Sequence, residues 1–202
     1  MFKKITLKDK SLYYQYIDKN KFLSCEYSFA TLFMWKDFND IEYDIVNNIF
    51  IIKKYDKNNG KFFMEPLGDI DDNSLINIID YLESIRKKEK SKWLFGDVSI
   101  NFLNRLEDIY KENLIFEEEI NNFDYVYNFD DLRNLSGRKF RKKRNKYNQF
   151  IKNYNYKTAF FKSFLDNKER EECLEFLDKW YLENKEMDEE FLAEIDGKRN
   201  LI

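Results

Sequence analysis

A short basic segment is the densest group of chemically competent side chains in the sequence. It places seven cations in nine residues: Arg138, Lys139, Arg141, Lys142, Lys143, Arg144 and Lys146. Arginine offers a phosphate two parallel hydrogen bonds, and lysine offers a compact point charge. Such a segment suits the phosphates of a nucleic acid, an anionic lipid head group or a nucleotide. We therefore expect phosphate or polyanion binding by Arg138, Lys139, Arg141, Lys142, Lys143, Arg144 and the amide of Asn145.

The basic segment is expected to lie on an amphipathic helix that begins at Ser136 or Gly137 and runs to about Tyr154. Its apolar positions recur at helical spacing and form one stripe: Phe140, Tyr147, Phe150, Ile151 and Tyr154. The stripe predicts that the helix packs against a core on one side and presents its cations on the other.

A neighbouring acidic stretch supports a second interpretation of the same cations. Residues 116–131 carry six acidic side chains and no basic ones, namely Glu117, Glu118, Glu119, Asp124, Asp130 and Asp131. These carboxylates would neutralise the basic helix within the fold, and charge runs are commonly solvated surfaces. The residues alone leave ligand binding and internal neutralisation open.

Composition excludes several kinds of catalytic and metal site. The chain contains no histidine, which excludes Ser-His and Cys-His catalytic pairs and most zinc sites, so we expect no metal site. Cys25 and Cys173 lie far apart in the sequence and are expected to be reduced thiols. Glu26 and Asp97 are carboxylates beside apolar segments, but a structural role is favoured for each. No catalytic residue is assigned.

Net charge and hydropathy limit the partners that the whole molecule can attract. The net charge of the 202-residue chain is −3, so any electrostatic attraction must come from local clusters. No run approaches the roughly 18 apolar residues that span a bilayer, and the N-terminus lacks the apolar core of a secretory signal. We expect a cytoplasmic protein, with a membrane-peripheral location as the alternative if the basic helix faces anionic lipid. Insertion of the apolar stripe into a membrane is less favoured, because the stripe is expected to pack against the protein core.

The remaining pattern predicts a mixed α/β (α+β) protein, with helices on a mixed sheet. The clearest signal is a hairpin, in which Asn59-Gly60 separates two apolar runs at 49–52 and 61–64. An amphipathic helix begins at Asp72 or Asn73, with Leu75, Ile76, Ile79, Leu82 and Ile85 on one face. Other strands are expected at 3–6, 93–95, 123–129 and 157–164, and other helices at 7–17, from Ser24, at 102–110, 168–184 and 189–195.

The part after residue 132 is expected to be an incomplete domain. It contains one predicted strand and about three helices, and a single strand cannot bury its faces or satisfy its edges. This part must borrow a sheet, pair with another chain or continue beyond the sequence, and we favour incompleteness. The expected domains are therefore 1–132 and 133–202.

Two segments resemble those of a bacterial protein family. Ser24–Trp35 (SCEYSFATLFMW) and Leu135–Phe150 (LSGRKFRKKRNKYNQF) are similar to segments of phosphatidylglycerol lysyltransferase C-terminal-domain proteins. The resemblance implies two consecutive GNAT-like (acyl-CoA N-acyltransferase-type) domains. Residues 1–132 would form the first domain, and residues 133–202 would open the second. Family members of known activity move an amino acid from aminoacyl-tRNA to a lipid, and more distant relatives move it to peptidoglycan precursors.

The resemblance implies a transferase whose donor is aminoacyl-tRNA or, less favoured, acyl-CoA. The basic helix would then hold the phosphates of the tRNA or of an anionic lipid head group. No Gln/Arg-x-x-Gly-x-Gly/Ala motif occurs, and residues 133–138 approach it only with the wrong spacing. We therefore predict no cofactor site within this chain. The alternative is a non-catalytic polyanion-binding protein or a truncated remnant.

Overall fold

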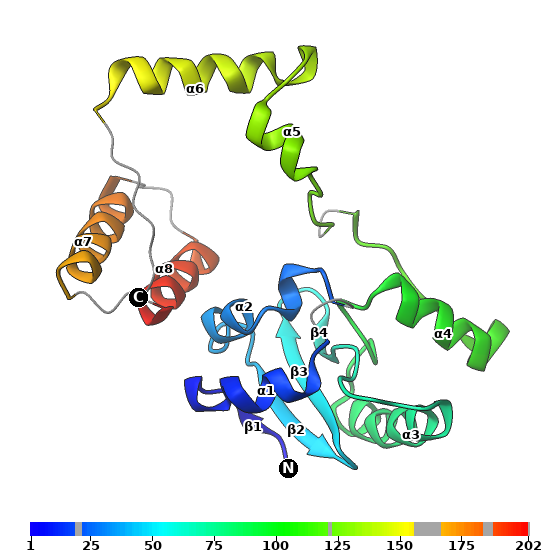
Figure 1. The fold of residues 1–202 in the computed structure, drawn as a ribbon. Helices are drawn as coiled ribbons and strands as arrows, with labels where there is room; N and C mark the ends of the chain where they lie inside the picture. The colour runs from blue at the N-terminus through cyan, green and yellow to red at the C-terminus, as the bar shows by residue number, and fades with distance from the viewer. Residues whose placement is uncertain (19–21, 121–122, 156–166, 184–187, 202) are drawn as a thin grey trace. The chain divides into compact units, whose positions relative to one another are not determined.

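The computed structural model describes residues 1–18, 22–120, 123–155, 167–183 and 188–201 (Figure 1). Contacts between Cα atoms divide the chain into two compact units. The first unit comprises Met1–Glu117 together with Lys168–Ile202, and the second unit comprises Glu118–Asn167. The predicted domain boundary near residue 132 rests on the family resemblance. Division into compact units does not test that boundary, so it stays a prediction.

The first unit is a mixed α+β structure built on a four-stranded antiparallel sheet. The strands β1 (Lys3–Lys4), β2 (Glu42–Val46), β3 (Ile49–Asp56) and β4 (Gly60–Phe63) lie in the order β1-β2-β3-β4. The predicted hairpin is confirmed: Asp56 pairs with Gly60 across the turn, and Gly60 has a φ of +75°. Asn47 and Asn48 join β2 to β3 with φ values of 51° and 62°, the backbone that a type I′ turn requires.

The segment predicted as a strand at 93–95 extends the sheet by only a short parallel contact. The Phe63 N–H donates to Leu94 O and the Gly96 N–H donates to Phe63 O, each at 2.9 Å. A Cβ atom at Gly96 would lie 2.6 Å from the ring of Phe62. Glycine is therefore the residue that lets this segment approach β4 so closely.

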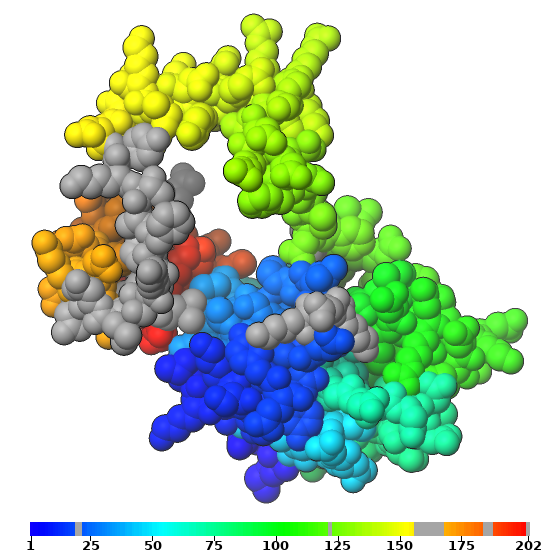
Figure 2. All heavy atoms as spheres, in the orientation of Figure 1, coloured from blue at the N-terminus to red at the C-terminus, as the bar shows by residue number. Residues whose placement is uncertain are grey.

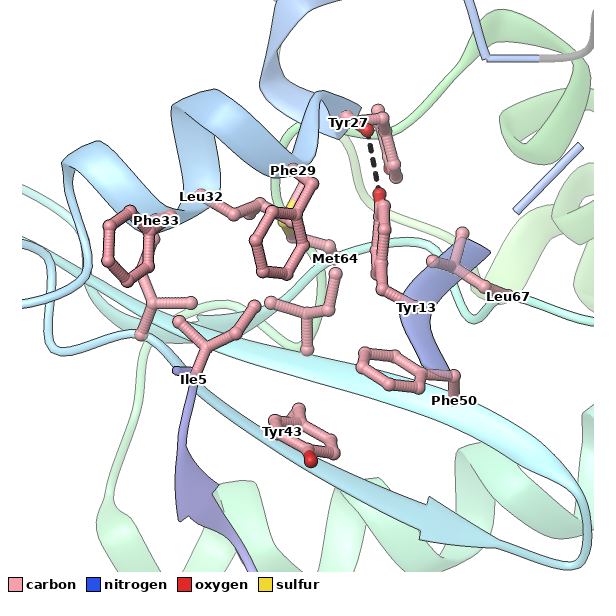
Figure 3. Close-up of a cluster of buried hydrophobic side chains, with 12 residues drawn as sticks. Ile5, Tyr13, Tyr27, Phe29, Leu32, Phe33, Tyr43, Phe50, Met64 and Leu67 are labelled. Carbon is pink, nitrogen blue, oxygen red and sulfur yellow. Dashed lines mark hydrogen bonds between the residues drawn. The ribbon is translucent and has the colours of Figure 1, made fainter. Parts of the chain in front are cut away.

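Helices cover both faces of the sheet because β3 alternates two sets of apolar side chains (Figure 1). Phe50 and Ile52 face α1 (Lys10–Tyr16) and α2 (Phe29–Met34), whereas Ile49 and Ile51 face α3 (Asp72–Glu89) and α4 (Ile100–Tyr110). The first of these clusters is shown in Figure 3, where Tyr13 donates to the carbonyl oxygen of Tyr27 at 2.7 Å. Burial on both faces explains why the first half of β3, residues 49–52, is a continuous apolar run.

Side chains cap the starts of three described helices, α3, α4 and α5 (Phe129–Asn134), through Asp71, Ser99 and Asn128. Thr6 and Asp9 form a capping box at the 3₁₀ turn Leu7–Asp9 that precedes α1. The Ser24 side chain accepts from Glu26 N–H at the 3₁₀ turn Cys25–Tyr27 rather than at α2. Helix α3 begins where predicted, but Ile78 is in its buried face and Ile76 is only half-buried.

The chain returns to the first unit through α7 (Asn167–Glu183) and α8 (Glu189–Leu201). Both helices were predicted, although α8 runs beyond the expected end at residue 195. Helix α8 packs on α2, and a Cβ atom at Gly197 would overlap the Cγ and the backbone oxygen of Met34. The close approach of the two helices therefore depends on the absence of a side chain at Gly197.

We expect Gly197→Ala to destabilise the docking of α8 by about 1–3 kcal/mol, the usual cost of overpacking. The sign of the stability change is diagnostic, because the same substitution at an exposed helical glycine stabilises a protein by about 0.5–1 kcal/mol. Asn200→Ala, at an exposed position of α8, is the control and should be neutral or slightly stabilising. Amide hydrogen exchange of α8 and thermal unfolding measure the difference. An unchanged or raised stability for Gly197→Ala contradicts the packing described here.

The second unit contains helices but no strand among its described residues. Its elements are α5 (Phe129–Asn134), the 3₁₀ turn Arg138–Phe140 and α6 (Arg141–Asn153). The predicted strand at 123–129 is wrong: residues 123–128 are extended coil and α5 begins at Phe129. Alternating apolar residues form a strand only where a partner strand is present, and the described part of this unit offers none. The strand predicted at 157–164 lies outside the described residues.

Candidate phosphate-binding site

The basic segment forms the helix that its spacing predicts. Gly137, with a φ of +80°, leads into the 3₁₀ turn Arg138–Phe140, and α6 continues from Arg141 to Asn153. Phe140 is buried, whereas the candidate phosphate-binding residues are exposed or, for Arg144, half-buried. Side chains of this helix stand out from its surface in the space-filling view (Figure 2). The helix therefore presents most of its cations to solvent.

Three of the seven candidate residues contact the rest of the second unit. Lys139 Nζ pairs with Asp131 Oδ2 at 2.6 Å, and Lys143 Nζ lies 4.9 Å from the centre of the Tyr127 ring. Arg144 Nη1 donates to the carbonyl oxygens of Leu135 and Gly137. Arg144 thus positions the turn that enters the helix, and these three cations are partly committed to the fold.

The other candidates, Arg138, Arg141, Lys142 and Asn145, make no hydrogen bond or ion pair with a described residue. Lys146 also makes no hydrogen bond or ion pair with a described residue. It lies one turn beyond Lys142 on the same side of the helix. Lys146 belongs to the basic segment, but the predicted site residues do not include it. Its i, i+4 spacing from Lys142 is the signal that would have added it. The free cations are therefore Arg138, Arg141, Lys142 and Lys146.

Internal neutralisation, the alternative role for these cations, is seen at Lys139 among the described residues. The Lys139–Asp131 ion pair joins the acidic stretch to the basic segment, whereas Glu117 lies 3.9 Å from Lys92. No acidic residue occurs between Arg138 and Tyr154. The four free cations repel one another without a compensating carboxylate among the described residues, and an anionic ligand would relieve that repulsion.

The apolar stripe of the helix is less buried than its pattern predicts. Phe140 is buried, but Tyr147, Phe150, Ile151 and Tyr154 are 56%, 45%, 38% and 62% exposed. The rings of Phe150 and Tyr154 stack with centroids 5.2 Å apart. The expectation that a core covers the whole stripe is therefore wrong within the second unit, because the described residues of this unit form no sheet on which the stripe could pack.

Glu26 and Asp97 occupy structural positions in the first unit. Their carboxylates lie 2.6 and 2.7 Å from Lys54 Nζ, and the Lys54 side chain is 7% exposed. Burial would lower the pKa of Lys54, but attraction to Asp97 and Glu26 and hydrogen bonds with both carboxylates raise that pKa above its ordinary value of 10.5. Tyr27 also donates to the backbone oxygen of Asp97 at 2.7 Å. The cluster joins three distant segments, as expected for a structural role.

A cavity of about 460 Å³ in the first unit is lined by residues that include Tyr16, Glu65, Phe102 and Arg105. Glu65 accepts hydrogen bonds from the backbone and the hydroxyl of Ser99. Arg105 is held by Asp72 at 2.8 Å and by the carbonyl oxygen of Ile70 at 2.6 Å. Both charged groups serve the fold itself, so the cavity ranks below the basic helix as a ligand site.

Metal-binding clusters and membrane-spanning helices are absent from the part of the chain that the structure describes. No group of three or more His, Cys, Asp or Glu side chains is placed to hold a metal ion there. Across the same described residues, every helix is too short or too polar to cross a bilayer.

Comparisons with known proteins connect the whole arrangement to one family. The family described as "Phosphatidylglycerol lysyltransferase, C-terminal" matches residues 20–200. A crystal structure of a conserved protein of unknown function from Bacteroides thetaiotaomicron VPI-5482 is similar, with a TM-score of 0.79 and 28% sequence identity. The match covers 99% of this chain and 67% of that one. The comparison with curated proteins gave no match.

Proposed function

Because this chain belongs to the phosphatidylglycerol lysyltransferase C-terminal family, we propose that it takes part in the transfer of an aminoacyl or acyl group to an amine or hydroxyl acceptor. The observation that carries the proposal is the set of free cations on the exposed basic helix, Arg138, Arg141, Lys142 and Lys146. These cations would hold the phosphates of an aminoacyl-tRNA donor or of an anionic lipid head group. Such a role places the protein in the cytoplasm, where aminoacyl-tRNA is found.

Positioning and electrostatics would supply most of the catalysis in a reaction of this kind. The acceptor nitrogen or oxygen attacks the carbonyl carbon of the donor ester and forms a new amide or ester bond. The ester bond to the tRNA hydroxyl breaks, and the proton of the acceptor passes to that leaving oxygen. Holding both substrates in place lowers the barrier by making the attack effectively unimolecular, and cations stabilise the negative charge that develops.

A GNAT-like architecture is part of the proposal. The first unit has an antiparallel sheet with helices on both faces, which is compatible with a GNAT-like domain. We propose a second GNAT-like domain that opens with the basic helix near residue 133. No general base is assigned, and the proposed step rests on the reacting groups and the positioned charges.

Replacing Arg138, Arg141, Lys142 and Lys146 with glutamine should weaken RNA binding in a salt-dependent manner. Each phosphate contact contributes roughly 0.7–0.9 to the slope of log K against log salt, so four lost contacts reduce that slope by about 3. We expect tRNA affinity to fall about 100-fold at moderate salt. Fluorescence anisotropy with labelled tRNA at several salt concentrations measures both quantities. The control replaces four exposed lysines of the first unit, Lys8, Lys10, Lys87 and Lys88, and should change the slope little.

Transfer itself is tested with aminoacyl-tRNA that carries a labelled amino acid, mixed with phosphatidylglycerol vesicles, and in parallel with labelled acyl-CoA. The proposal expects label in the lipid fraction with the aminoacyl donor, and less label after the four glutamine substitutions. Salt-dependent tRNA binding with no transfer to any acceptor would instead favour a non-catalytic polyanion-binding protein. Absence of both binding and transfer would reject both functions.

A further inference from the structure

We propose that the second unit carries a self-complementary surface through which two copies of this chain associate. The surface has two parts, both within this unit. The acidic strip comprises residues 118–120 and 123–131, and the basic helix comprises residues 138–153. The proposal concerns assembly and does not depend on the transfer reaction. Arg141 and Lys146 also belong to the proposed phosphate-binding set, so a phosphate-bearing ligand and a second copy would compete for these two cations.

The acidic strip is apolar as well as acidic, and its apolar side chains are exposed. Val126, Tyr125, Phe129 and Ile120 are 93%, 88%, 74% and 71% exposed, and Phe123 is 59% exposed. Single exposed apolar residues are ordinary, but several large ones on one short segment are typical of an interaction surface. Five carboxylates accompany them: Glu118, Glu119, Asp124, Asp130 and Asp131.

The basic helix presents the matching chemistry. Its exposed stripe continues from Tyr147 to Tyr154, and Arg141 and Lys146 flank that stripe on opposite sides at 3.6 residues per turn. An apolar stripe bordered by cations fits an apolar strip bordered by carboxylates. Shape and charge would thus favour the same pairing, with the apolar groups at the centre and the ion pairs at the rim.

Within one copy, the start of the basic helix already contacts the acidic strip, whereas the side chains of the later part of the helix stay exposed. Lys139 pairs with Asp131, and Lys143 lies over the Tyr127 ring. Arg144 adds hydrogen bonds to the turn before the helix. These contacts involve the first turns of the helix, so the stripe beyond Arg144 keeps its exposed side chains. A second copy can cover that stripe with its own acidic strip, and a two-fold arrangement satisfies both copies at once.

Other occupants fit this surface less well. An anionic bilayer would attract the basic helix but repel the five carboxylates of the acidic strip. RNA would pair with the cations but would leave the aliphatic residues of the strip, Ile120 and Val126, exposed. A stable interface buries about 800 Å² per partner. Fully covered aromatic side chains contribute roughly 150–250 Å² each, so the exposed aromatics of the unit can supply the apolar part.

Sedimentation velocity of the whole chain over a range of concentrations tests the proposal. We expect a species with the mass of two chains. Tyr147→Ser with Phe150→Ser should raise the dimer dissociation constant at least ~30-fold. The matched control is Gln149→Ser, on the same helix but away from the stripe, which should leave the dissociation constant unchanged. Circular dichroism verifies that each variant keeps its helices.

A charge exchange separates association between copies from pairing within one copy. One variant carries Arg141→Glu and Lys146→Glu, and the other carries Glu118→Lys and Asp130→Lys. Each variant alone should remain a monomer, and an equimolar mixture should recover a dimer that contains one of each. A monomeric wild-type chain overturns the proposal, as do aggregates without fixed stoichiometry, a dimer insensitive to the stripe variant, a mixture that stays monomeric, or an association seen only with vesicles or RNA.

Discussion

Phe50→Ala will lower the free energy of unfolding of the first unit by about 3–5 kcal/mol, the cost of truncating a fully buried aromatic residue. Phe50 is 0% exposed and belongs to the first hydrophobic cluster, where it lies near Tyr13 and Tyr43 (Figure 3). Its ring stacks on Tyr43 with centroids 4.7 Å apart and meets Tyr13 edge-on at 5.6 Å. Removal of the ring therefore loses apolar burial and aromatic contacts and leaves a cavity between the sheet and α1.

Two substitutions on the same strand calibrate this result. Phe50→Leu keeps much of the volume and should cost about 1–2 kcal/mol. Tyr55→Ala, at a side chain that is 41% exposed, should cost less than about 1 kcal/mol. Urea unfolding followed by tryptophan fluorescence gives all three values. A loss for Phe50→Ala no larger than that for Tyr55→Ala would contradict the burial of Phe50 in the core.

Glu26→Gln together with Asp97→Asn should destabilise the first unit by about 3–5 kcal/mol, because the two changes leave the buried Lys54 charge without a partner. Both substitutions keep the size of the side chain. Asn also tolerates the left-handed backbone at position 97, where φ is +53°. The destabilisation therefore reports the electrostatic pairing rather than a change of shape or backbone.

A triple variant distinguishes the effect of the unpaired Lys54 charge from the effect of packing. The triple change Lys54→Met, Glu26→Gln and Asp97→Asn removes the uncompensated charge and fills the same space with an apolar side chain. It should recover at least half of the stability lost in the double variant, since an apolar replacement of a buried ion pair is commonly neutral or stabilising. A triple variant as unstable as the double one would show that the cluster acts through geometry alone.

The pH dependence of unfolding provides an independent readout of the same cluster. The pKa of Lys54 is raised in the native state, so its stabilisation is complete below the ordinary value of 10.5 and is lost as pH rises through the raised value. Burial raises the pKa values of Tyr13 and Tyr27, which also lowers stability above about pH 10. In the double variant, burial lowers the Lys54 pKa. Its contribution to stability should then increase with pH up to about 10.5, opposite in sign to the wild-type contribution.

Local sequence signals correctly predicted those elements in which the apolar pattern and the turn or capping residues indicate the same structure. Asn59-Gly60 predicted the β3–β4 hairpin, and the apolar spacing after Asp71 predicted α3. The basic helix formed at the predicted residues because its cations and its stripe both follow a helical period. In each case the information lies within one turn or one helix, where neighbouring residues determine the backbone.

Long-range pairing explains what the sequence did not reveal. Lys54 follows the apolar half of β3, and its partners Glu26 and Asp97 are 28 and 43 residues away. No local pattern indicates that they converge. The strand prediction at 123–129 was wrong for a related reason. Its alternating apolar residues are typical of a strand, but a strand needs a partner strand, which the local sequence does not reveal. The cover of the stripe at 147–154 depends on tertiary contacts in the same way.

The return of the chain to the first unit has a consequence for biosynthesis. Helix α2 is made early, whereas α8, which packs against it through Gly197, follows after the whole second unit. At about 5–20 residues per second, the ribosome needs roughly 4–17 s to proceed from Glu117 to the end of α8. During that interval the face of α2 around Met34 stays uncovered on the nascent chain. This face is therefore covered only when α8 emerges from the ribosome, so the first unit completes its packing after the second unit has been made.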